Sequence, residues 1–142
     1  MGQPGHLARR LQQASYLLWT SIVSEEVTAP QLVVLNVLAA RPGVDQRTLG
    51  ELGSLDRSTV ADVVSRLVRR GLVERLRDPE DRRRNVLQLT LEGRTTLVRL
   101  APRTATMNRI LLSPLTPDQQ EVLLELLGRL VEAGERLRAK GP

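Results

Sequence analysis

Residues 55–93, LDRSTVADVVSRLVRRGLVERLRDPEDRRRNVLQLTLEG, contain the pattern that decides the fold. Asp56 is placed to cap a helix that Gly71 would end. One face of this helix is apolar and is formed by Val60, Val63, Val64, Leu67 and Val68. The next segments, LVERLR and NVLQLT, alternate apolar and polar residues, which predicts two half-buried strands. The charged loop RDPEDRRR between them is therefore expected at the tip of a β-hairpin.

The residues on the N-terminal side of this stretch predict further helices. Residues 6–23, HLARRLQQASYLLWTSIV, have helical periodicity. In TAPQ, Thr28 and Gln31 form a capping box ahead of QLVVLNVLAA, whose almost continuous apolar residues indicate a buried helix. Residues 46–55, QRTLGELGSL, predict a short helix broken by Gly53. Successive helices followed by a hairpin are the order of a winged helix–turn–helix.

The residues on the C-terminal side predict two long helices, from about 91 to 112 and from about 117 to 139. Pro102 is expected to kink the first of them or to break it into two. Thr116 and Gln119 repeat the capping box ahead of the second. Its leucines on one side are Leu123, Leu126, Leu127, Leu130 and Leu137. The expected fold class is mainly α with a small β-hairpin wing (α+β), in one domain of 142 residues.

The composition narrows the function classes. The chain has 21 basic and 16 acidic residues, a net charge of +5, and all but one of the bases are arginine. This excess suits a polyanionic partner. No cysteine is present, which excludes disulfides, a thiol nucleophile and thiolate metal ligation. No apolar run is long enough to span a bilayer and the first residues lack a signal-peptide core, so we expect a cytoplasmic protein without a membrane partner.

The winged helix–turn–helix explains the charge of the hairpin tip. In such a fold the helix before the hairpin enters the DNA major groove, and the tip reaches the adjacent minor groove. A narrow minor groove attracts an arginine, and neighbouring arginines contact phosphates. We expect Asp78, Glu80 and Asp81 to hold these arginines in one pose before DNA binds. The alternative is a solvated tip whose charge has no function.

The whole stretch from Leu55 to Gly93 resembles the MarR family of bacterial transcriptional regulators, in the order LDRSTV, RL, RGLVER, DPEDRR, LT and G. The segments TAPQ and LTPDQ are similar to that family as well. The resemblance implies one MarR-like domain over residues 1–142, with a DNA-binding lobe at 28–90 and dimerisation helices at 1–24 and 91–142. It also implies a homodimer on a pseudo-palindromic operator, and a ligand pocket between the dimerisation helices and each lobe.

The same resemblance assigns the DNA-binding residues. On the recognition helix they are Arg57, Ser58, Thr59, Asp62 and Arg66, and in the wing they are Asp81, Arg82, Arg83 and Arg84. Arg83 is expected in the minor groove with Asp81 as its support, whereas Arg82 and Arg84 contact phosphates or stay free in solvent. Asp62 would accept a hydrogen bond from cytosine or orient an arginine. Arg69 and Arg70 are interpreted as favourable charges at the helix C-terminus.

The first predicted helix carries the only histidine and the only two aromatic residues of the chain. His6, Arg10 and Gln13 fall on one side of it, with Tyr16 and Trp19 on an adjoining flank. The segment GHLARRLQQ resembles a MarR subgroup that responds to aromatic carboxylic acids. Arg10 would then bind the carboxylate, His6 a hydroxyl, and the aromatic residues a ring. The alternative is a solvated polar stripe with both aromatic residues in the dimer core.

Other function classes have little support in the sequence. Ser15, His6 and Asp45 lack any nucleophile motif, so we expect no catalytic residues and no enzyme. The sequence has no glycine-rich phosphate-binding loop, so we expect no cofactor. A metal site would have to combine His6 with carboxylates such as Glu25 and Glu26, and a single histidine gives such a site little support. We expect a dimeric repressor that a small aromatic carboxylic or phenolic ligand releases from double-stranded DNA. The remaining alternative is a ligand-independent, architectural DNA-binding protein.

Overall fold

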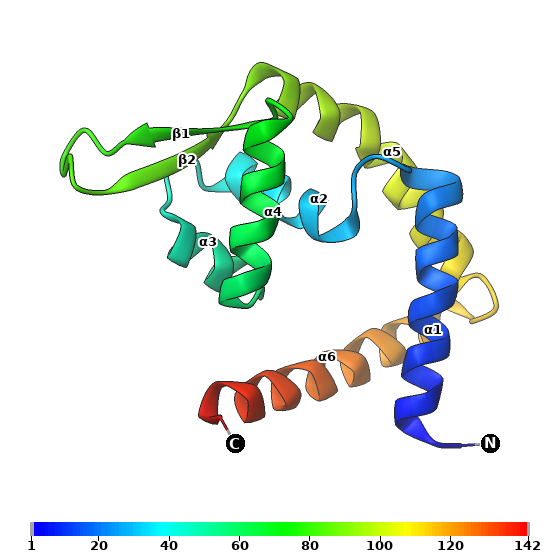
Figure 1. The fold of residues 1–142 in the computed structure, drawn as a ribbon. Coiled ribbons are helices and arrows are strands. Elements are labelled where there is room, and N and C mark those ends of the chain that lie inside the picture. Colours follow the sequence, from blue (N-terminus) through cyan, green and yellow to red (C-terminus); the bar gives the residue numbers. More distant parts are fainter. Residues whose placement is uncertain (1, 142) are drawn as a thin grey trace. The chain divides into compact units, whose positions relative to one another are not determined.

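The structure is a computed structural model that describes residues 2–141. Its helices and strands (Figure 1) are α1 (Pro4–Leu18), the short π-helix η1 (Trp19–Val23), α2 (Ala29–Ala40), α3 (Gln46–Leu52), α4 (Arg57–Arg69), β1 (Val73–Arg77), β2 (Asn85–Leu89), α5 (Leu91–Leu112) and α6 (Pro117–Lys140). This order confirms the predicted mainly helical fold with a two-stranded hairpin. The chain divides into two compact units, residues 1–107 and 108–142.

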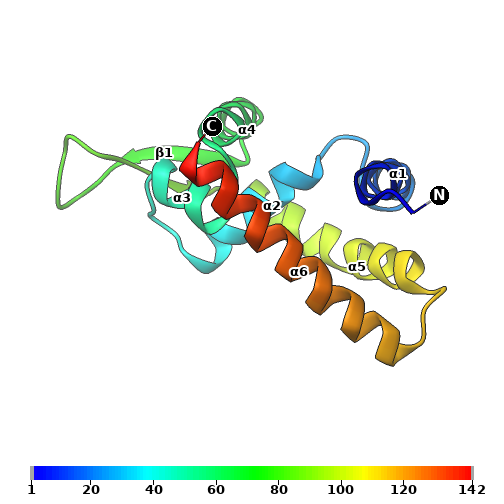
Figure 2. The same ribbon diagram turned by 90° about the horizontal axis from the view of Figure 1, so that it is seen from below.

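The core of the first unit lies among α2, α3, α4 and the hairpin. As predicted, α2 is largely buried, with Leu35 and Leu38 almost inaccessible to solvent. The predicted apolar face of α4 is also confirmed, since Val60, Val63, Val64 and Leu67 are buried and Val68 packs against them. Burial of this face leaves the opposite, polar face of α4 exposed. Figure 2 views α1 nearly end-on and shows it on the far side of α2 from α3 and α4.

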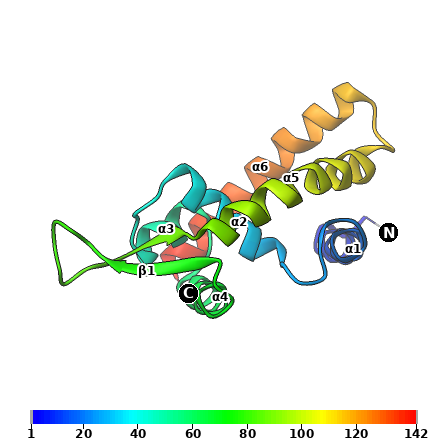
Figure 3. The same ribbon diagram turned by 90° about the horizontal axis from the view of Figure 1, so that it is seen from above.

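The two strands pair antiparallel, from Val73 opposite Leu89 to Arg77 opposite Asn85. An isolated bridge between Val44 and Leu87 ties the segment before α3 to β2. The predicted half-burial is wrong for the outer part of β1, where Leu76 is 39% exposed. Figure 3 shows the outer part of the hairpin projecting beyond α3 and α4, in agreement with this exposure.

The helix ends follow the local signals in the sequence. Thr28 and Thr116 form the predicted capping boxes with Gln31 and Gln119, and Asp56 caps α4. α3 ends at Leu52 with Gly53 as its C-cap, and Gly71, the residue after the C-cap of α4, takes a positive φ of 76°. α5 continues through Pro102, so the break considered above does not occur. No described helix is long and apolar enough to cross a membrane.

The second unit contains the end of α5 and the whole of α6. Gln120 closes the turn between them by donating to the carbonyl oxygens of Leu112 and Leu115, both at 3.1 Å. α6 has no buried residue in the part of the chain that the structure describes. Three leucines of the predicted apolar side, Leu126, Leu130 and Leu137, are exposed. An apolar helix face of this length is unusual for an isolated soluble chain.

Candidate functional site

The N-terminal turn of α4 is organised by the Asp56 carboxylate. Its Oδ1 accepts hydrogen bonds from the backbone N–H of Thr59 at 2.7 Å and from the Ser58 hydroxyl at 3.1 Å. Arg57 and Ser58 are exposed, and Thr59 is half-buried. The first turn of a helix presents free N–H groups and a positive dipole end, which favour anions such as phosphate. The structure thus places Arg57, Ser58 and Thr59 together at the N-terminal end of α4, where Asp56 already accepts from Ser58 and Thr59.

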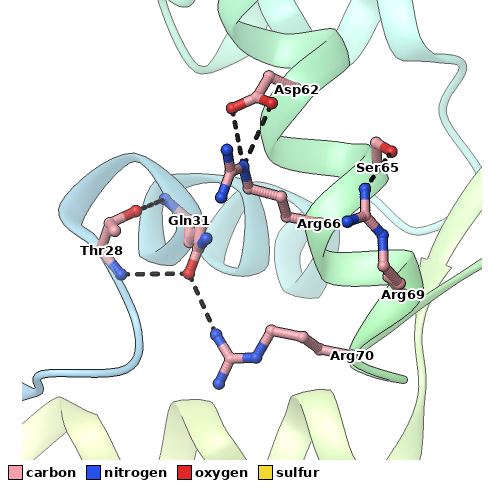
Figure 4. Close-up of polar contacts among 7 residues, drawn as sticks. All are labelled: Thr28, Gln31, Asp62, Ser65, Arg66, Arg69 and Arg70. Carbon is pink, nitrogen blue, oxygen red and sulfur yellow. Dashed lines mark hydrogen bonds and ion pairs between the residues drawn. The ribbon is translucent and has the colours of Figure 1, made fainter.

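The middle of the exposed face of α4 carries an ion pair. Arg66 Nε lies 3.1 Å from Asp62 Oδ2 and 3.2 Å from Oδ1 (Figure 4). Both side chains remain more than 60% exposed. Exposed pairs of this kind contribute only about 0.2–1 kcal/mol, so the guanidinium can exchange its partner at small cost. This geometry agrees with the second of the roles considered for Asp62, which is to orient an arginine.

A hollow of about 540 Å³ lies between α3 and the start of α4. Its lining includes Arg47, Glu51 and Arg57. Arg47 Nε donates to Glu51 Oε1 at 3.3 Å in another exposed pair. The sequence analysis did not identify Arg47. Its position on the first helix of the helix–turn–helix, next to the recognition helix, could have indicated it. Arg47 and Arg57 thus contribute two cationic side chains to the lining of this hollow.

Two of the three acidic residues of the wing loop, Asp78 and Asp81, accept hydrogen bonds from backbone amides rather than from arginine side chains. Asp78 Oδ1 accepts from Glu80 N at 3.0 Å, and Asp81 Oδ1 accepts from Arg83 N at 3.1 Å. The expectation that they hold guanidinium groups is therefore wrong in this structure. The reason is reach, because a short aspartate side chain bonds most easily to the amide two residues ahead. Asp81 supports Arg83 through the turn of the main chain.

Arg84 is the wing arginine that has a carboxylate partner. Its Nη2 lies 2.8 Å from Asp45 Oδ2, so Arg84 is not free in solvent, whereas its contact with phosphate stays a prediction. Asp45 also caps α3 by accepting from Thr48 N at 2.7 Å. Hydrogen bonds from Thr48 lower the pKa of Asp45, and the positive charges of Arg84 and Arg47 lower it further. Asp45 thus joins the loop of the wing to α3.

The remaining wing arginines divide into bound and unbound side chains. Arg77 Nη1 donates to the carbonyl oxygen of Arg82 at 2.9 Å, and Arg75 Nη1 donates to Gln46 Oε1 at 3.3 Å. Sequence reasoning missed both. Within residues 2–141 the side chains of Arg82 and Arg83 make no hydrogen bond or ion pair, and both are exposed. These two guanidinium groups are therefore open to an anionic partner.

The candidate ligand residues on α1 fall into two groups. Tyr16 and Trp19 line a cavity of about 180 Å³ between α1, η1 and the start of α2, and Gln12 and Ser15 line it with them. The Trp19 indole is half-buried and donates to the Val27 carbonyl oxygen at 2.6 Å. Drug-sized ligand pockets have volumes of about 300–1,000 Å³, so this cavity suits a smaller molecule.

The other three candidates, His6, Arg10 and Gln13, are exposed and do not line that cavity. His6 Nδ1 lies 3.4 Å from Arg9 Nη2 on the same helix. The structure thus brings the two aromatic residues together and leaves the polar stripe outside. No group of three or more histidine, aspartate or glutamate residues in the described part of the chain is arranged to hold a metal ion.

A family model described as "MarR family" matches residues 27–84. The transcriptional regulator HosA of Escherichia coli O111:H- is 31% identical over 128 residues, which are 90% of this chain and 94% of HosA. The match extends beyond the helix–turn–helix into both terminal regions.

Solved structures give the same result. The PcaV transcriptional regulator from Streptomyces coelicolor, solved with its natural ligand, is 57% identical with a TM-score of 0.90, and 94% of each chain is covered. Bordetella bronchiseptica BpsR, whose DNA binding is regulated by 6-hydroxynicotinic acid, is 27% identical with a TM-score of 0.86 and coverage of 92% and 94%. The repressor CouR, bound to a 23-mer DNA duplex, is 29% identical with a TM-score of 0.78 and coverage of 91% and 92%.

Proposed function

The chain belongs to the MarR family of DNA-binding transcriptional regulators, and we propose that it is a dimeric repressor which a small aromatic acid releases from its operator. The observation that carries the proposal is the cationic surface shared by α4 and the wing. It combines an exposed recognition helix face with an arginine-rich hairpin tip that projects beyond the helices. Such a surface fits the major groove and the adjacent minor groove.

Each DNA-binding candidate has a role in this proposal that its geometry supports. Arg57 and Arg66 face base edges or phosphates in the major groove, and Asp62 holds Arg66 until DNA replaces it. Ser58 and Thr59 lie at the helix end that attracts phosphate. In the wing, Arg83 enters the minor groove, Asp81 shapes its turn, and Arg82 contacts phosphate. Arg84 acts through Asp45 to fix the loop of the wing against α3.

The proposed homodimer is supported by unpartnered apolar surface. Leu130 and Leu137 on α6 are 70% and 73% exposed, and Leu7 and Leu11 on α1 are 44% exposed. A second copy of the chain would cover such faces in a two-fold arrangement, as most soluble homo-oligomers do. Two lobes related by a two-fold axis then require two half-sites about one helical turn apart.

The proposed effector class is supported by the relatives and by residue chemistry. BpsR responds to 6-hydroxynicotinic acid, a molecule with an aromatic ring, a carboxylate and a hydroxyl group. Tyr16 and Trp19 offer a ring-binding wall, and Arg10 can bind a carboxylate through two parallel hydrogen bonds. His6 and Gln13 supply further polar groups on the exposed stripe beside Arg10. A ligand site would use this stripe together with the cavity.

The test begins with selection of a binding sequence from random duplex DNA by the full chain. We expect a pseudo-palindrome with half-sites about one helical turn apart. Adding 6-hydroxynicotinic acid or hydroxybenzoic acids should then release the labelled duplex, with an uncharged aromatic amide as the control. Failure to select a pseudo-palindrome contradicts the proposed operator recognition. Selection without release by any of these acids favours the ligand-independent alternative.

A further inference from the structure

Arg70 connects the end of the recognition helix to a distant segment. Its Nη1 donates to the Glu26 carbonyl oxygen at 2.7 Å. The same Nη1 donates to Gln31 Oε1 at 3.3 Å (Figure 4). Arg70 is the C-cap residue of α4, whereas Glu26 lies in the segment between η1 and α2. The interpretation of Arg70 as only a favourable charge at the helix end is therefore incomplete. It is a cross-link between elements about forty residues apart in the sequence.

The segment that Arg70 holds is also a wall of the aromatic cavity. Ser24, Glu25, Val27 and Thr28 line that cavity together with Trp19. The Trp19 indole donates to the Val27 carbonyl oxygen, and Arg70 donates to the carbonyl oxygen one residue earlier. The carbonyl oxygens of two consecutive residues, Glu26 and Val27, thus accept hydrogen bonds from Arg70 of α4 and from Trp19 of the cavity wall.

The segment has few ways to absorb a local shift. Ser24 Oγ accepts from the backbone N–H groups of Glu26 at 3.0 Å and Val27 at 2.9 Å. Gln31 Oε1 accepts from Thr28 N at 3.2 Å as well as from Arg70 (Figure 4). Because Gln31 is only 6% exposed, its amide is held within the lobe. These hydrogen bonds restrain the segment that Arg70 contacts.

We infer that Arg70 is a positioning residue that couples occupancy of the Tyr16–Trp19 cavity to the pose of the recognition helix. A ring that enters the cavity and displaces the Trp19 indole would shift the Glu26–Val27 peptide and, through Arg70, the end of α4. Coupling between two sites is reciprocal, so DNA bound to α4 must also alter the surroundings of Trp19. This regulation rests on the proposed function, but the effect of DNA on Trp19 is measurable without any effector.

The test compares Arg70→Met with Arg69→Met in the full chain. Both variants lose one arginine and keep an apolar stem, but Arg69 donates only to Ser65 Oγ, at 3.5 Å on its own helix. Trp19 is the only tryptophan, so its emission reports on the cavity alone. With saturating selected duplex, confirmed by anisotropy of labelled DNA, we expect an emission change in wild type and Arg69→Met and none in Arg70→Met. An unchanged wild-type emission, or a full response in Arg70→Met, would overturn the inference.

A second measurement uses 6-hydroxynicotinic acid as the probe. In wild type and Arg69→Met, its dissociation constant should rise on DNA binding by a factor in the usual allosteric range of about 5–150. In Arg70→Met the ratio should fall toward unity while binding to the free protein persists. A wild-type ratio retained in Arg70→Met overturns the coupling. If Trp19 responds to DNA through Arg70 but the acid never releases wild type, the coupling is supported and the proposed effector class is contradicted.

Discussion

Gly93 occupies a position where no side chain fits. A β-carbon built there would overlap the Leu72 carbonyl oxygen and lie 3.3 Å from a Leu89 methyl group. That carbonyl is fixed because it accepts from Thr90 N at 3.1 Å. We expect Gly93→Ala to lower the free energy of unfolding by about 1–3 kcal/mol, as measured by urea denaturation. Gly128→Ala is the control, because nothing lies within 4 Å of its β-carbon. Equal stabilities of the two variants would contradict the close approach at Gly93.

Arg83 and Asp81 test the wing at the residue scale. Arg83→Ala should weaken binding of the selected duplex by about 1–3 kcal/mol, the scale of one well-placed groove contact. Asp81→Ala should reproduce part of this loss, because the turn that presents Arg83 loses its hydrogen bond to Arg83 N. Asp81→Asn keeps an acceptor oxygen and removes the charge, so it should bind at least as well as wild type. Fluorescence anisotropy at one salt concentration compares all three.

The outcome for Asp81 separates two accounts of the wing. A purely cationic loop would bind more tightly whenever an acid is removed, because the local positive potential rises. Under that account both Asp81 variants gain affinity. Binding of Asp81→Ala equal to or tighter than wild type would therefore show that the turn at Asp81 does not present Arg83.

Arg10 tests the proposed ligand stripe. It lies on α1, far in sequence from α4 and the wing, and it is exposed. Arg10→Ala should keep operator binding and weaken the response to 6-hydroxynicotinic acid, because a bidentate partner of the carboxylate is lost. Arg41→Ala, which removes an exposed arginine outside α1, is the charge-matched control. A folded Arg10→Ala variant that no longer binds the duplex would place Arg10 in the dimer or DNA surface instead.

At the scale of elements, Asp45 and Arg84 join α3 to the wing. The pKa of Asp45 is lowered from its usual 3.8, first by the Thr48 hydrogen bonds and then by the nearby arginines. A lowered folded-state pKa adds stability above the unfolded pKa, and this stability is lost as pH falls through the folded value. Wild type should thus lose more unfolding free energy than Asp45→Asn when the pH drops from above 3.8 to well below it. Parallel pH profiles of the two proteins, measured by thermal unfolding, would contradict this.

The elements also show which features a sequence can predict. Both capping boxes and the Asp56 cap join residues three positions apart, so local spacing contains all the information they need. The pair between Asp45 and Arg84 depends instead on the bridge from Val44 to Leu87. Arg70 likewise finds Glu26 only after α4 packs on α2. Alternation predicted the strand β1, but its exposure depends on which elements cover it, and none covers Leu76.

At the scale of the whole molecule, the apolar side of α6 is the feature that one chain leaves unexplained. Leu126, Leu130 and Leu137 are 49%, 70% and 73% exposed on the side where the sequence places a leucine stripe. Their exposure supports the proposed second copy of the chain, because a dimer interface would bury these leucines and a monomer would leave them in water. The DNA lobe and the stripe then have separate functions, and a change in the stripe should leave the lobe folded.

Leu130→Gln tests the proposed dimer interface. Glu132→Gln is the control, because it introduces glutamine at an exposed position of α6 two residues further along the chain. Full burial of one leucine contributes about 1.5–3 kcal/mol. A two-fold interface loses that contribution twice, about 3–6 kcal/mol, which raises the dimer dissociation constant by about 10²–10⁴. Analytical ultracentrifugation should show this rise for Leu130→Gln and wild-type behaviour for Glu132→Gln. The same variant should bind an isolated half-site as wild type does and lose the affinity gained from the second half-site. If Leu130→Gln stays dimeric at the lowest concentrations that keep wild type dimeric, the leucine side of α6 does not form the dimer interface.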